Sequence, residues 1–255
     1  MTGTAPVSER VLARFGAAGG PGTQLLCLPY AGGGAQVFRG WQERVPAGVE
    51  VTGVRLPGRE QRFREAPLDT WPEALAELAA AVAPEAARGP YAFFGHSLGA
   101  RLAYELTHAL TEAGHRPPEL LVVAACRAPG RAPRHRTMHD MDGPELLERL
   151  REMNGVPPEV LENQQLMRMF EPVLRADLRL AETWEPSPGA IGTPILAMCG
   201  ERDDIDHYED MTGWRRHTTG AFAIRSFPAG HFFLRDEEAA VVAEIAAHLP
   251  SGPGR

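Results

Sequence analysis

Lysine is absent from this chain of 255 residues, so all 26 of its basic residues are arginine. The lack of lysine excludes Schiff-base catalysis and the phosphate-binding lysine of a P-loop. Acidic residues number 33, the net charge is −7, and no basic run is longer than a few positions. We therefore expect no nucleic-acid partner, because binding to a phosphate backbone needs concentrated positive charge.

Cysteines and long apolar stretches are also scarce. The three cysteines, Cys27, Cys126 and Cys199, lie in or at the end of apolar runs, where a free cysteine behaves as a small buried hydrophobe. No apolar stretch reaches the roughly 18 residues that a transmembrane helix needs, and the first residues contain no apolar leader segment. These features predict a cytoplasmic protein with free thiols and without a membrane partner.

The remaining composition, 44% hydrophobic and 23% charged, is that of an ordinary globular protein. Six short apolar runs are nearly continuous rather than alternating, which is typical of strands covered on both faces. They occupy residues 23–30, 49–56, 91–95, 120–126, 194–200 and 222–227. Helical periods lie at residues 70–87, 98–113 and 236–249. The alternation predicts an α/β fold in which a mostly parallel, doubly wound sheet has helices on both faces, with residues 1–255 as a single domain.

One stretch, residues 127–188, interrupts this alternation. It opens with a linker rich in proline and arginine, contains no convincing strand, and continues as two or three amphipathic helices between residues 143 and 184. An insertion between two strands usually lies over the carboxyl ends of the sheet, where ligands bind. The segment is therefore either a helical lid over a site or a helical pair that completes the core.

The strongest chemical signal is the pentapeptide Gly95-His96-Ser97-Leu98-Gly99, which ends a predicted strand and begins a predicted helix. In a G-x-S-x-G nucleophile elbow, the glycines allow a tight turn that holds the serine in a strained conformation at the edge of the sheet. The helix N-terminus then favours negative charge that develops beside the serine. This context predicts Ser97 as a catalytic nucleophile rather than a structural turn residue.

A nucleophilic serine needs a base and an acid that orients the base, and in this architecture the chain order is serine, carboxylate, histidine. His231 follows the last predicted strand in a loop that a glycine precedes, and it fits the general base. Asp203, Asp204 and Asp206 follow the strand at 194–200. Asp203 is our choice for the acid that holds the imidazole in the correct tautomer, and Asp204 is its rival.

Donors for an oxyanion are expected at two places. Residues 29–34 (PYAGGG) follow the first predicted strand with little side-chain bulk, so their backbone N–H groups can approach a substrate oxygen closely. We assign one donor to the amide of Ala31 and the other to the amide of Leu98. A dinucleotide site is the rival interpretation of the glycine cluster, but the cluster lacks the G-x-G-x-x-G spacing.

No cofactor and no metal is expected. His135 and His139, together with Asp140, have the spacing of a helical metal pair, but they follow the proline-rich linker and have no obvious third ligand. His96 lies inside the elbow and faces the wrong way for a base. We expect it to pack or to line the pocket.

These segments together resemble an α/β-hydrolase, and specifically the stand-alone type II (editing) thioesterases that accompany polyketide synthases and nonribosomal peptide synthetases. The resemblance runs from about residue 24 to residue 249. Its motifs include LPYAGGGAQVFRGW, VRLPGREQRFREAP at residues 54–67, FFGHSLGARLAYEL, and GVPPEVLENQQLMRMFEPVLRADLRLAETW in the insertion. It ends with the P-I-L-A-x-x-G-x-x-D and F-x-x-G-H-F-F segments. The LPGRE loop and the insertion motif separate this family from other esterases.

The resemblance implies hydrolysis of acyl groups from the phosphopantetheine arm of an acyl carrier protein or a peptidyl carrier protein, which clears stalled or misprimed synthases. Acyl-CoA is a second candidate substrate. Ser97, Asp203 and His231 match the catalytic positions of the family, whereas Tyr30 stands where many relatives have histidine. The alternatives are an acyltransferase or a general carboxylesterase with the same triad, and a non-catalytic module that binds carriers.

Contacts with substrate and carrier are expected around these motifs. The side chains expected to line the acyl site, or alternatively to pack in the core, are Tyr30, His96, Met167, Met169 and Phe170. Because carrier domains are typically acidic, arginines are expected near the entrance. The candidates are Arg59, Arg62 and Arg64 in the LPGRE loop and Arg131, Arg134 and Arg136 before the insertion helices. The alternative for each arginine is a solvated charge or an internal partner of a neighbouring carboxylate, and a structural role is favoured for Arg59, which lies beside Glu60.

Overall fold

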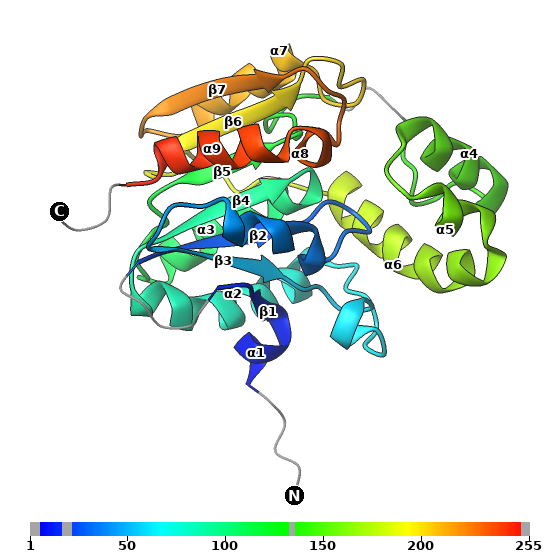
Figure 1. Ribbon diagram of the computed structural model, residues 1–255, viewed down its shortest axis with the longest axis horizontal. Helices are drawn as coiled ribbons and strands as arrows, with labels where there is room; N and C mark the ends of the chain where they lie inside the picture. The colour runs from blue at the N-terminus through cyan, green and yellow to red at the C-terminus, as the bar shows by residue number, and fades with distance from the viewer. Residues whose placement is uncertain (1–5, 17–21, 133–135, 251–255) are drawn as a thin grey trace, which may run out of the picture.

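A computed structural model describes residues 6–16, 22–132 and 136–250. At its centre lies a seven-stranded sheet with the order β1-β3-β2-β4-β5-β6-β7 (Figure 1). The strands are β1 (Leu12–Arg14), β2 (Thr23–Leu28), β3 (Val49–Val54), β4 (Tyr91–His96), β5 (Leu121–Ala124), β6 (Ile195–Gly200) and β7 (Phe222–Phe227). Strands β2 to β7 pair in parallel, and β1 pairs antiparallel with β3. The predicted, mostly parallel sheet is confirmed. All six predicted strands are present, β7 with the predicted ends and the other five with one or both ends shifted.

Helices cover both faces of this sheet, which explains why the strand sequences do not alternate. In β2, Leu26 and Leu28 belong to one buried apolar cluster, and Leu25 and Cys27 belong to another. The first cluster packs against α1 (Val7–Val11), α2 (Trp71–Arg88), α3 (Leu98–Glu112), α7 (Tyr208–Met211) and the 3₁₀ helix η3 (Thr212–His217). The second packs against the 3₁₀ helix η1 (Ala35–Glu43), α8 (Phe233–Asp236) and α9 (Glu238–His248). The doubly wound arrangement is therefore confirmed.

The insertion folds as three helices, α4 (Gly143–Met153), α5 (Pro158–Glu162) and α6 (Gln164–Glu182). Local signals set their ends. The Asp142 carboxylate accepts a hydrogen bond from the amide of Glu145 at the start of α4, and Asn154 ends that helix in the left-handed conformation, with φ 53°. The Asn163 side chain caps α6 by accepting hydrogen bonds from the amides of Gln165 and Leu166.

The insertion helices α4 and α5 lie beside the main fold (Figure 1). The insertion has an apolar cluster of its own. It contains Met138, Met141, Leu146, Leu150, Val156, Leu161, Leu174 and Leu178. Helix α6 extends from this cluster to the sheet, where it contacts α3. The three helices lie where two or three amphipathic helices were expected, and α6 is the part that joins them to the core.

The cysteines and the apolar helices can also be compared with the expectations from the sequence. All three cysteines are buried and unbridged, as expected. No helix in the described ranges is long and apolar enough to cross a membrane.

Candidate active site

Ser97 lies between β4 and α3 in a strained turn. Its backbone has φ 54° and ψ −111°, a left-handed conformation that costs energy for a residue with a side chain. Two glycines make the turn sterically feasible. A Cβ on Gly95 would lie 2.2 Å from the carbonyl oxygen of Gly99, and a Cβ on Gly99 would lie 2.1 Å from that of Leu28. The pentapeptide therefore has the geometry of a nucleophile elbow, with Ser97 at the N-terminus of α3.

Asp203 and His231 form a buried pair at the ends of the loops that follow β6 and β7. The Nδ1 atom of His231 donates to Oδ2 of Asp203 at 2.9 Å. The other carboxylate oxygen accepts hydrogen bonds from the backbone amides of Ile205, at 2.9 Å, and Asp206, at 3.0 Å. The carboxylate is thus held by three donors, and the proton on Nδ1 leaves Nε2 of His231 as the acceptor.

Electrostatics favour the charged form of both partners. Burial opposes ionisation of Asp203, but the charge and hydrogen bond of His231 and the two backbone amides outweigh it, so the pKa of Asp203 is lowered. Burial likewise opposes protonation of His231, but the charge and hydrogen bond of Asp203 raise the pKa of His231. Asp204, which is exposed, raises that pKa less than Asp203 does.

His96 links the elbow to this pair. Its ring centroid lies 5.4 Å from that of His231 and 5.6 Å from that of Tyr30, in edge-on contacts. The side chain is fully buried, and burial holds the pKa of His96 well below its ordinary value, so the imidazole is neutral. Of the two expectations for His96, packing and lining the pocket, the structure supports packing, because a side chain without exposed surface lies beneath the site.

The predicted oxyanion segment forms a tight turn after β2. The amide of Gly33 donates to the carbonyl of Tyr30 at 2.8 Å, and Gly32 adopts φ 76°, which favours glycine. Within the described ranges, the amides of Ala31 and Leu98 donate no hydrogen bond. Both predicted donors are therefore available to a ligand. We call residues 30–33 the oxyanion turn.

Tyr30 is engaged by an arginine that the sequence did not single out. Arg235, which follows His231 by four residues, donates to the Tyr30 hydroxyl at 2.6 Å and to the carbonyl of Gly155 at 2.8 Å. Its guanidinium carbon also lies 4.7 Å from the ring centroid of Phe232. The Tyr30 side chain is thus committed to internal contacts.

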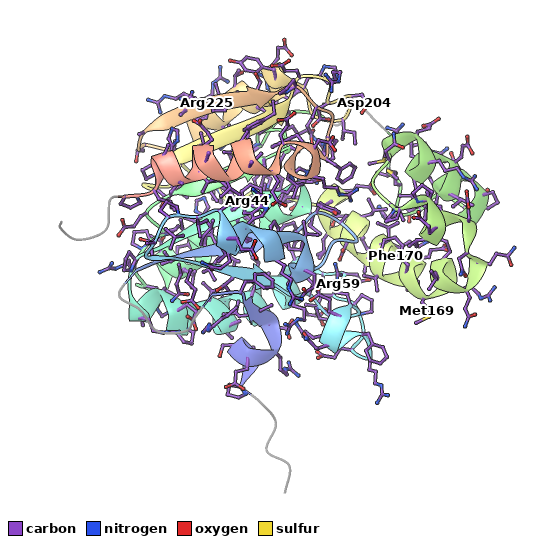
Figure 2. All side chains as sticks on the ribbon, viewed as in Figure 1. Arg44, Arg59, Met169, Phe170, Asp204 and Arg225 are labelled. Carbon is purple, nitrogen blue, oxygen red and sulfur yellow. The ribbon has the colours of Figure 1, made fainter. Side chains whose placement is uncertain are left out.

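The three residues of α6 that were expected to line the acyl site have different surroundings. Phe170 lies against the oxyanion turn, since a Cβ on Gly32 would be 2.6 Å from its ring. Met167 is half-buried against the insertion cluster. Met169 is 64% exposed on another side of α6 (Figure 2), so the structure does not bring it to the other site residues. The expectation for Met169 is corrected accordingly.

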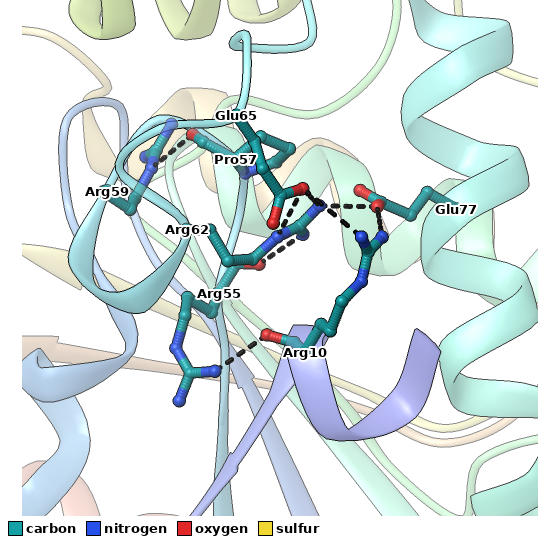
Figure 3. A network of polar contacts seen from close by, with 7 residues as sticks. All are labelled: Arg10, Arg55, Pro57, Arg59, Arg62, Glu65 and Glu77. Atoms are coloured by element: carbon teal, nitrogen blue, oxygen red, sulfur yellow. Dashed lines mark hydrogen bonds and ion pairs between the residues drawn. The ribbon is translucent and has the colours of Figure 1, made fainter. Parts of the chain in front are cut away.

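The arginine candidates divide into buried and exposed groups. Arg59 pairs with Asp177, which confirms an internal partner. Arg62 is 2% exposed and donates to Glu65 and Glu77 at 2.6 Å each (Figure 3). Of the alternatives for Arg62, the structure therefore supports the internal partner over contact with a carrier, because a network beneath the surface occupies the guanidinium.

The remaining candidates lie nearer to solvent. Arg64 stacks on the exposed ring of Phe63, with 5.2 Å between guanidinium carbon and ring centroid. Arg131 is exposed, and Arg136 is an exposed partner of Glu145. Arg134 lies outside the described residues.

The spacing of His135, His139 and Asp140 before the insertion suggested a metal pair, but His139 has protein partners instead. Nδ1 of His139 contacts Glu182 and its Nε2 lies 3.2 Å from Asp140, so the ring joins the linker to α6. His135 lies outside the described residues. No group of three or more metal-ligating side chains with suitable geometry was found in the described ranges.

Asp177 is, with Arg235, a residue beside the site that sequence analysis missed. It is 1% exposed in α6 and accepts a hydrogen bond from the amide of Gly32 at 2.7 Å. One signal was available, because Asp177 is an acidic residue on the apolar face of a helix, between Leu174 and Leu178. A buried charge on such a face needs a partner, although the sequence does not say which one.

Comparison with known proteins gives a consistent result. The family model for the thioesterase domain matches residues 23–249. Thioesterase PikA5 of Streptomyces venezuelae is 37% identical over 237 residues, which cover 92% of this chain and 84% of that protein. The solved thioesterase RedJ, from the prodiginine pathway of Streptomyces coelicolor, is 36% identical with a TM-score of 0.82, and the match covers 92% of this chain and 90% of RedJ.

A second solved structure, the type II thioesterase BorB from the borrelidin biosynthetic cluster, is 34% identical with a TM-score of 0.82. The match covers 98% of this chain and all of BorB. The similarity therefore extends over the sheet, the elbow and the insertion together.

Proposed function

Because the chain belongs to the thioesterase family and has its α/β-hydrolase fold, we propose that it hydrolyses thioesters with Ser97 as nucleophile, His231 as general base and Asp203 as the orienting acid. The observation that carries this assignment is the strained Ser97 at the start of α3, beside a neutral His96 whose ring contacts the buried His231–Asp203 pair. The Ala31 and Leu98 amides are the proposed oxyanion donors.

The first half of the reaction acylates the enzyme. The Ser97 hydroxyl oxygen attacks the thioester carbonyl carbon while His231 Nε2 takes its proton, and the carbonyl electron pair moves onto the oxygen. That oxyanion accepts hydrogen bonds from the Ala31 and Leu98 amides. When the carbonyl reforms, the carbon–sulfur bond breaks, and the thiolate leaves with the proton from His231.

The second half releases the acid. Water gives a proton to His231 and attacks the acyl-serine carbon, and the Ser97 oxygen leaves with that proton. Asp203 remains ionised through both halves and stabilises the imidazolium that forms twice. The low pKa of Asp203 suits this role.

We further propose that the thiol belongs to the phosphopantetheine arm of an acyl or peptidyl carrier protein, and that the reaction edits stalled or misprimed synthases. Support comes from relatives whose names place them in such pathways, including RedJ and BorB. Acyl-CoA carries the same arm and is a second substrate. Residues 127–188 act as a lid within a single domain, and the exposed Arg64, Arg131 and Arg136 offer positive charge to an acidic carrier. The free, buried cysteines suit the cytoplasm.

Intact-protein mass spectrometry during turnover of a short acyl thioester on a carrier domain tests the proposal. We expect an acyl adduct on Ser97 that decays to free acid. Ser97→Ala should lose up to roughly 10⁶-fold in kcat and form no adduct, and His231→Ala should be similarly impaired. Ser226→Ala, which changes an exposed serine on β7, is the matched control and should behave as wild type.

Two results would contradict the assignment. If Ser97→Ala kept activity within tenfold of wild type, Ser97 would not be the nucleophile. Transfer of the acyl group to an added amine or alcohol in preference to water would make the protein an acyltransferase.

A further inference from the structure

Helix α6 and the LPGRE loop hold the oxyanion turn at two successive residues. The Gly32 amide donates to Oδ2 of Asp177 at 2.7 Å, and the Gly33 carbonyl accepts from an Nη atom of Arg59 at 2.8 Å. Arg59 and Asp177 also bind each other through two parallel hydrogen bonds, of 2.7 and 2.8 Å. Their side chains are 9% and 1% exposed, so the pair is shielded from water and firmly defined.

Apolar contacts join the same three segments. Phe170 and Leu174 of α6 both pack on Gly32, where a Cβ would lie 2.6 Å from the first side chain and 3.3 Å from the second. The loop that carries Arg59 packs on α6 as well, since a Cβ on Gly58 would lie 2.8 Å from Val173. The insertion, the LPGRE loop and the oxyanion turn therefore form one packed unit.

We propose that Asp177 and Arg59 are positioning residues that hold the oxyanion turn, so that α6 is a working part of the catalytic site and not only its cover. This inference rests on the proposed function, because it takes the Ala31 amide as an oxyanion donor. Ala31 immediately precedes Gly32 in a turn with three following glycines, which has little stiffness of its own. Bonds from outside the turn are needed to aim its amide at the reacting oxygen.

The charge of the pair matters as much as its geometry. Asp177 places a carboxylate one residue from the proposed donor, where an unpaired negative charge would oppose the developing oxyanion. Arg59 neutralises that charge within the buried pair. Removing Arg59 alone should therefore impair the reaction more than removing both charges together.

The test compares Asp177→Asn, Arg59→Gln and the double variant with wild type. Arg175→Gln is the matched control, because Arg175 lies on the same helix and binds Glu171 and the linker carbonyls without contacting the turn. The measurements are kcat, KM and the inhibition constant of an acyl trifluoromethyl ketone. Ser97 adds to the carbonyl carbon of this inhibitor, its proton passes to His231, and the electron pair stays on the oxygen as a stable oxyanion.

We expect kcat to fall about 100-fold in Asp177→Asn, the ketone to bind more weakly by a similar factor, and KM to change less than about threefold. The double variant should be more active than Arg59→Gln. Arg175→Gln should keep kcat and ketone affinity near wild type. If the pair only stabilised the fold, kcat and the affinity for the ketone would not fall by a similar factor.

Arg59→Lys keeps the buried charge pair, and hence the fold, but cannot contact Gly33 and both oxygens of Asp177 at once. We expect it to lower kcat about tenfold at unchanged KM. Wild-type kcat and ketone affinity in both Asp177→Asn and Arg59→Lys would overturn the inference. Ser97→Ala is measured in the same assay. If it is inactive while the Asp177 and Arg59 variants behave as wild type, the proposed function stands and only the inference about the two positioning residues fails.

Discussion

Replacement of Asp203 by asparagine tests the acid–base pair with a minimal change of shape. The backbone amides of Ile205 and Asp206 both point at one oxygen of the Asp203 side chain. An asparagine therefore keeps its oxygen at that position, because its NH₂ group would face two donors if it were reversed. The NH₂ group must then face Nδ1 of His231. Because an NH₂ group only donates, Nδ1 has to accept this hydrogen bond and cannot carry a proton. The proton moves to Nε2, the atom that has to take the proton of Ser97.

The magnitude follows from this tautomer change. A serine enzyme whose histidine is held in the wrong tautomer loses about 10⁴-fold in kcat, which corresponds to roughly 5.4 kcal/mol of transition-state stabilisation. The pH dependence should change too. The base acts when neutral, so kcat/KM rises with pH through the pKa of His231, which Asp203 raises in the wild type. Without that charge the pKa falls, and the rising limb of the profile moves to lower pH.

The assay is steady-state hydrolysis of an acyl thioester from pH 5 to pH 9, with a thiol reagent to detect the product. Asp204→Asn is the control, since its exposed carboxylate has a smaller effect on the pKa of His231. We expect near wild-type rates and an unchanged profile from it. If Asp203→Asn kept kcat within tenfold of wild type, or if Asp204→Asn were the more damaged variant, the assignment of the acid would be refuted.

Two further changes test the framework around the site. Gly99→Ala should lower the free energy of unfolding by about 3 kcal/mol in urea titrations, because its Cβ would lie 2.1 Å from a backbone oxygen of β2 that cannot move away. Gly143→Ala, with open space around the new Cβ, should change it by less than about 1 kcal/mol, and equal effects would contradict the steric argument. Arg62→Gln should cost about 2 to 3 kcal/mol because it removes the charged hydrogen bonds of a buried guanidinium to Glu65 and Glu77, which keep only Arg10 as a partner among the described residues. Arg136→Gln, at an exposed ion pair, should cost less than about 1 kcal/mol. Similar thermal melting points for the two arginine variants would show that burial does not set the difference.

The main strands and the elbow were predictable because their signals are local. A strand buried on both faces needs a continuous apolar run, and a strand-to-helix turn around Ser97 needs small residues at Gly95 and Gly99. The chain order of the triad then reduced the choice of base and acid to a few positions. His231 pairs with Asp203, which was the acid chosen from the sequence.

Shorter elements and side-chain directions were not predictable in this way. β1 has three residues and α1 has five, too few for a period to show, and their pairing with β3 and α2 depends on distant partners. The spacing of Met169 and Phe170 could not say which one faces the sheet, because adjacent helical positions point about 100° apart and the helix orientation comes from tertiary packing. The burial of His96 similarly depends on aromatic rings from the loops after β2 and β7.

The contacts of the insertion limit how the site can open. Besides the bonds of Asp177 to the oxyanion turn, the carbonyl of Gly155 accepts from Arg235, and a Cβ on Gly155 would lie 2.6 Å from Phe232, the neighbour of His231. The two ends of the segment 155–177 are therefore fixed to opposite halves of the catalytic site. A swing of the whole insertion as one body would break both sets of contacts and would displace the oxyanion turn, whose Ala31 amide is the proposed oxyanion donor. Helix α4 precedes both attachments and α5 lies between them, so movement of these two helices admits an acyl chain without displacing either attachment.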